Sequence, residues 1–315
     1  MELKHKITDH LLACDYEHAR LELYHFIEGQ STADQQAMLT KRIKDCIQVN
    51  DQQRLSLIGE SLLAIGRLVS KRHVIRDFAA RSLAATPCPL GMLPIGDWLQ
   101  TDLVRTYLIA QVFSQSYDES KRFKVLYQLY DASDTEGKVA CLRSLHFMQG
   151  QIKDGLEVIH DAGRTYLSEL LEAAWCNNLF SSTYMSTEEF RKAVMKALFC
   201  DVSIEGFLGI DRAADQELSR RLCEYANERE AAERTVPLAV WRVAAYYPVE
   251  GLVARLIGRL EHPKREERLC AAISLLRAND DLALPFIESR LRREEDPEIH
   301  SVLSQASLGQ LDFSK

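Results

Sequence analysis

Residues 190–248 read FRKAVMKALFCDVSIEGFLGIDRAADQELSRRLCEYANEREAAERTVPLAVWRVAAYYP, and this stretch indicates the fold most clearly. Two strongly helical segments flank a turn that contains Gly206 and Gly209. Just before them, Ser186 and Glu189 have the spacing of a capping box, in which each side chain bonds a free amide at a helix start. Apolar residues then recur at helical spacing, so the stretch predicts two helices that pack against neighbours.

Charged residues interrupt the apolar faces of these two helices. Lys196 lies between two apolar faces, where it either extends its stem to reach water or points into a cavity. Arg229 falls within an apolar stripe, and a buried guanidinium needs a carboxylate or several carbonyl oxygens around it. Asp211 or Asp215 is expected to cap the second helix. The sequence leaves open whether Arg229 is structural or faces a ligand.

We predict a concave polar pocket between the helices at 187–200 and 215–233. Unpaired burial of charged groups is costly, so such groups persist as internal ion pairs or because a site needs them. The residues expected near the wall of this pocket are Lys196, Asp211, Arg212, Glu228 and Arg229.

The same stretch carries a family resemblance. K-A-L-F at 196–199, G-I-D-R-A at 209–213, E-Y-A-N-E-R-E-A-A-x-R-x-V-P at 224–237 and then Trp241-Arg242 resemble the EboA family, over about residues 175–248. EboA-like proteins are encoded in bacterial gene clusters for secondary-metabolite trafficking. The resemblance implies a role in moving or handling a metabolite, and it brings no established catalytic residues.

Asn177 and Asn178 stand in a polar loop just before the first of these helices. Such a pair is typical of a turn, but in the light of the resemblance it is also a candidate ligand contact. We therefore add Asn177 and Asn178 to the predicted ligand-binding residues.

Composition is that of an ordinary globular protein: 315 residues, 46% apolar, 27% charged, and a net charge of −7. Nothing in it suggests a nucleic-acid partner. The chain has only 14 glycines and 8 prolines to interrupt helices, and no alternation of apolar and polar residues indicates strands. We predict an all-α protein of stacked antiparallel helical hairpins, a HEAT-like α-solenoid with no sheet.

Three regions are expected along the chain. The segment from Thr86 to Gly96 is rich in proline and is the expected first boundary. Pro263 and Pro297 each precede a helix, with a further helix expected at about 282–293 between them, as in HEAT-like repeats. The expected regions are an N-terminal helical bundle at 1–86 with helices at 7–28, 32–49 and 74–85, a central EboA-like region at 97–248, and C-terminal repeats at 249–315, all joined in one solenoid.

The eight cysteines form no C-x-x-C pair, which fits a reducing compartment better than a disulfide framework. The charged start Met1–Lys6 precedes no apolar run, so no signal peptide is expected. No apolar stretch approaches the length of a membrane span. These features predict a cytoplasmic protein.

His160-Asp161 resembles the H-D dipeptide of metal-dependent phosphohydrolases, which also need a histidine upstream and an aspartate downstream. The alternative is a helix end closed by Gly163. The further ligands of such a metal site would come from His73, His146, Asp201 and Asp211.

We therefore expect a non-enzymatic binding or adaptor protein in metabolite trafficking, with no cofactor, no metal and no catalytic residue. Its partner would be a small-molecule metabolite or a protein of a biosynthetic or export pathway. One alternative is a metal-dependent hydrolase that uses His160-Asp161, and another is a helical protein-interaction scaffold.

Overall fold

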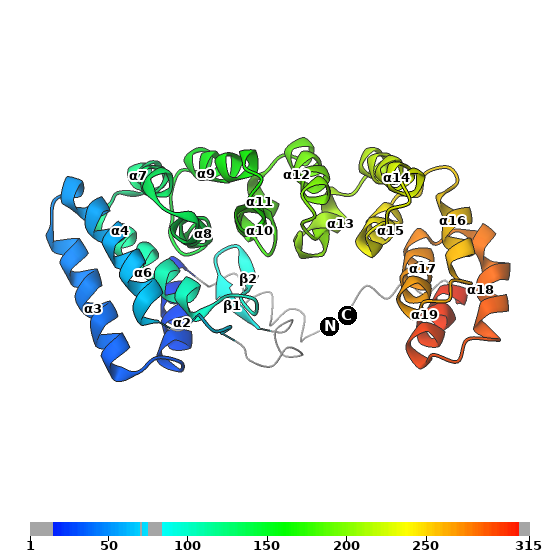
Figure 1. The fold of residues 1–315 in the computed structure, drawn as a ribbon, viewed down its shortest axis with the longest axis horizontal. Helices are drawn as coiled ribbons and strands as arrows, with labels where there is room; N and C mark the ends of the chain where they lie inside the picture. Colours follow the sequence, from blue (N-terminus) through cyan, green and yellow to red (C-terminus); the bar gives the residue numbers. More distant parts are fainter. Residues whose placement is uncertain (1–14, 70, 75–83, 309–315) are drawn as a thin grey trace. The chain divides into compact units, whose positions relative to one another are not determined.

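A computed structural model describes residues 15–69, 71–74 and 84–308 (Figure 1). The chain divides into two compact units. The first unit runs to Ser186 and also takes Cys200–Val202 and Gly206–Leu208; the second takes the other residues from Thr187 onward. The all-α prediction is confirmed, because α-helices build both units apart from one small hairpin. The division into three regions and the solenoid arrangement stay predictions.

The first unit begins with three helices, α2 (Tyr16–Glu28), α3 (Ala33–Gln48) and α4 (Asp51–Leu68). Each start is capped by a side chain that accepts a bond from an amide within its first turn. The caps are Asp15, Thr32 and Asn50. These helices match the predictions at 7–28 and 32–49, although residues 7–14 and most of the helix predicted at 74–85 lie outside the described residues.

An antiparallel hairpin of β1 (Ala85–Cys88) and β2 (Gly91–Pro94) follows, so the prediction of no sheet is wrong here. Pro87 and Pro89 disfavour helix, whereas a two-stranded ladder tolerates residues without an N–H group. Gly91 has φ 133°, which only glycine adopts without strain. Cys88 and Leu93 are fully buried, so the hairpin fills space beside α2.

The rest of the first unit is helical: α6 (Gln100–Ser116), α7 (Glu119–Ala132), α8 (Thr135–Ser144), α9 (Ile152–Arg164), α10 (Ser168–Trp175) and α11 (Leu179–Tyr184). Helix α6 lies in the core and contacts α2, α3, α4, α7 and α8. The N-terminal helices therefore share their core with the helices that follow the hairpin.

The second unit contains α12 (Thr187–Phe199), a 3-10 turn at Ile204–Gly206 that it shares in part with the first unit, α13 (Ile210–Ala213), α14 (Gln216–Ala231), α15 (Leu238–Ala244), α16 (Leu252–Arg259), α17 (Arg265–Ala278), a 3-10 turn at Asp281–Ala283, α18 (Leu284–Leu291) and α19 (Pro297–Ser307). Asp215 caps α14 by accepting a bond from the Leu218 amide at 2.8 Å. From α14 onward, helices pack on near neighbours in the chain, as in α16 on α17 and α18 on α19.

None of the helices in the described part of the chain combines the length and the apolar character needed to cross a membrane.

Candidate functional site

Five of the predicted ligand-binding residues lie in the second unit, on helices that touch one another. Lys196 is half-buried on α12, and α12 contacts both α13 and α14. Asp211 and Arg212 are exposed on α13. On α14, Glu228 is exposed and Arg229 is half-buried. We call these five residues together the α12–α14 face, after the helices that carry them, and their arrangement around one pocket stays a prediction.

Arg229 has the carbonyl partner that a partly buried guanidinium requires. Its Nε donates to the carbonyl oxygen of Thr235 at 2.6 Å, and its Nη1 donates to the Tyr225 hydroxyl at 3.1 Å. That hydroxyl in turn donates to the carbonyl oxygen of Leu198 at 3.3 Å. Arg229 thus ties the segment after α14 to the C-terminal end of α12, which gives it a structural task.

An exposed aromatic ring ends α12, and a tight turn precedes α13. Phe199 is 65% exposed, and its ring packs edge-on against Tyr225 with centroids 5.6 Å apart. Gly209 has φ 73°, and the Arg212 guanidinium lies across it, so that a Cβ there would stand 2.7 Å from Nη2. Glycine adopts this left-handed backbone without strain, whereas a larger residue would also displace the Arg212 side chain.

The predicted residues Asn177 and Asn178 belong to the first unit. Asn177 has φ 50° and donates its amide to the carbonyl oxygen of Gly206 at 2.6 Å. The Asn178 side chain is buried; its oxygen accepts from the Ser181 amide at 2.9 Å, and its nitrogen donates to the carbonyl oxygen of Ala173 at 2.8 Å. Both polar ends of Asn178 are thus bonded within the protein, where they cap α11.

His146 is fully buried beside this cap, and sequence patterns did not mark it as structural. Its Nδ1 lies 2.8 Å from the carbonyl oxygen of Arg143, and its Nε2 accepts from the Phe180 amide at 3.4 Å. One nitrogen must donate and the other accept, so the ring is neutral. Burial lowers the pKa of His146 to about 4.

The His160-Asp161 pair lies on α9, where Asp161 forms an ion pair with Arg164 at 3.2 Å. Across residues 15–69, 71–74 and 84–308, no group of three His, Cys, Asp or Glu side chains is placed to hold a metal ion. Gly163 lies inside α9, where a Cβ would come within 2.9 Å of the Trp175 ring. Its small size therefore serves helix packing.

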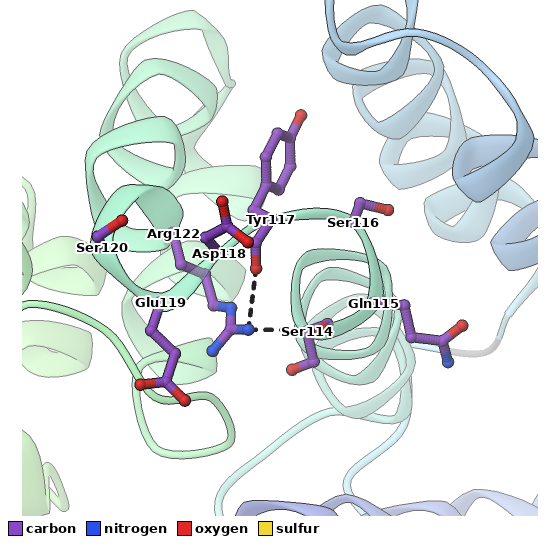
Figure 2. Close-up of a pocket in the computed structure, with 8 residues that line it drawn as sticks. All are labelled: Ser114, Gln115, Ser116, Tyr117, Asp118, Glu119, Ser120 and Arg122. Atoms are coloured by element: carbon purple, nitrogen blue, oxygen red, sulfur yellow. Dashed lines mark hydrogen bonds between the residues drawn. The ribbon is translucent and has the colours of Figure 1, made fainter.

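A surface hollow of about 570 Å³ opens where α6 passes into α7 (Figure 2). We call it the α6–α7 hollow. Its lining residues are Ser114, Gln115, Ser116, Tyr117, Asp118, Glu119, Ser120 and Arg122. The sequence did not predict this hollow, although residues 114–120, where one helix passes into the next, are mostly polar.

Arg122 lines the hollow and is only 8% exposed. It donates to the carbonyl oxygens of Phe113, Ser114, Tyr117 and Gln149 at 3.2, 3.3, 2.9 and 2.5 Å. Two of these bonds are dashed in Figure 2. Arg122 thereby supplies donors to the Phe113 and Ser114 carbonyls in the last turn of α6. Burial lowers the pKa of Arg122, and no carboxylate bonds to it in the described structure.

The side chains around Arg122 are polar and in part unsatisfied. The Oγ atoms of Ser114 and Ser116 are buried and have no hydrogen-bond partner among the described residues. Asp118 stands at the N-cap of α7, but its side chain makes no bond to the helix amides. Tyr117 turns its ring away from the Arg122 guanidinium (Figure 2) and packs under Arg54, whose guanidinium carbon is 5.1 Å from the ring centroid.

No curated protein and no solved structure matched this chain. One protein family did match: its description is "Metabolite traffic protein EboA", and the match runs over residues 20–245. This range includes the α6–α7 hollow, the α12–α14 face and the Asn178 cap. Because the match covers well over half of the 315 residues, the chain belongs to the EboA family.

Proposed function

We propose that this chain is a non-enzymatic binding protein of the cytoplasm that takes part in the traffic of a secondary metabolite or its precursor. The observation that carries the proposal is the EboA match over residues 20–245. Within that range the chain offers polar surface in both units, the α6–α7 hollow in one and the α12–α14 face in the other. Such surfaces suit binding of a metabolite or of a pathway protein.

We assign the α12–α14 face to recognition of a charged partner in this pathway. Asp211 and Arg212 on α13 and Glu228 on α14 are exposed, and so is the ring of Phe199 at the end of α12. Exposed charges steer encounter and select partners, and an aromatic ring adds contact area. Arg229 supports the face from beneath through Tyr225.

The proposal is tested in host cells with the gene intact, deleted, or replaced by variants. Untargeted mass spectrometry compares small molecules in the cells and in the medium. We expect deletion to change where at least one compound accumulates, without changing the mass of that compound. Profiles that are identical with and without the gene would contradict a role in traffic, and loss of a chemical conversion would contradict a binding role.

A double charge reversal, Arg212→Glu with Glu228→Lys, tests the α12–α14 face in the same cells. We expect it to reproduce the deletion while the purified variant keeps its helix content and melting temperature. The matched control is Arg292→Glu, which reverses an exposed charge after α18 and outside the matched range. Equal effects of the two variants would remove the α12–α14 face from the proposal.

A further inference from the structure

We draw no further inference here: the strongest candidate, the side-chain cluster of the first unit in which Arg20 and Arg122 donate to the carbonyl oxygens of Phe147 and Gln149 in the loop after α8, carries no binding site, because Arg122 directs its donors to backbone carbonyl oxygens and nothing in the described structure shows a ligand that Arg20 would face.

Discussion

Arg54 and Arg122 occupy equivalent positions in two helical hairpins. Each lies in the first turn of its helix and donates through Nη2 to the carbonyl oxygen just before the N-cap residue, Arg54 to Val49 at 2.6 Å and Arg122 to Tyr117 at 2.9 Å. Both also bond a carbonyl in the last turn of the preceding helix. The two arginines thus hold consecutive helices at a fixed turn, and their guanidinium groups replace the water that would otherwise solvate helix C-termini.

Arg122→Met should lower the free energy of unfolding by about 3 kcal/mol, because it leaves several buried carbonyl groups without donors. Arg122→Lys should recover little of this loss. The donors of a guanidinium point in several directions, and one ammonium group cannot reach all of the carbonyl groups that Arg122 bonds. Urea denaturation measures both variants. Lys124→Met, at an exposed position of the same helix, is the control. A loss for Arg122→Met no larger than that of the control would contradict this role.

Acid should destabilise the first unit through His146. Its pKa is about 4 when folded and 6.5 in the unfolded reference, so the unfolded chain binds the proton first. The stability contribution is complete above pH 6.5 and is lost as the pH falls from 6.5 to 4, by about 3 kcal/mol. Denaturation of the parent and of His146→Gln at pH 7 and pH 4.5 measures the difference. The variant should show a clearly smaller pH effect, and parallel curves would refute the assignment.

Arg229→Ala should lower the free energy of unfolding by about 1–3 kcal/mol, because Tyr225 and the Thr235 carbonyl lose their donor. Thermal denaturation of the parent and the variant measures this loss. Arg234→Ala removes an exposed arginine from the same segment and should have little effect. A stable Arg229→Ala variant that nevertheless alters metabolite distribution would instead assign Arg229 to ligand contact.

Glu294 in the second unit forms ion pairs that should make the stability of the protein depend on pH. Its side chain is only 2% exposed and lies 3.1 Å from Arg268 and 2.6 Å from Arg290. Burial alone would raise the pKa of Glu294, but the bonds from Arg268 and Arg290 lower it to about 2. Its stabilising effect is therefore present above pH 4.5 and is lost as the pH falls toward 2.

Glu294→Gln should cost about 3 kcal/mol at pH 7, because the largely buried Arg268 loses its carboxylate partner and Arg290 keeps only the exposed Glu261. The control is Glu298→Gln, which removes an exposed partner of Arg265 and should cost less than about 1 kcal/mol. Urea denaturation at pH 7 compares the two. Equal losses would show that burial of Glu294 has no energetic consequence.

Helix positions could be predicted wherever a cap and an apolar stripe coincide. The helix expected at 32–49 is Ala33–Gln48, with Thr32 and Gln35 in a capping box, and the one expected at 215–233 is Gln216–Ala231, begun by Asp215. The resemblance to the EboA family, based on residues near the second of these helices, is confirmed as well. The predicted role of the α12–α14 face stays a prediction.

The sequence by itself determined the helices, because a cap joins groups within one turn and an apolar stripe repeats within one helix. Only the tertiary structure decided which polar groups are satisfied. The donor for the Gln149 carbonyl is Arg122, and the Phe180 amide bonds His146, partners that packing brings together from distant parts of the chain. The α6–α7 hollow and the hairpin at 85–94 arise in the same way. The spacing of residues along one helix carries no information about such partners. They depend on where each helix lies, which is fixed by how side chains pack throughout the core.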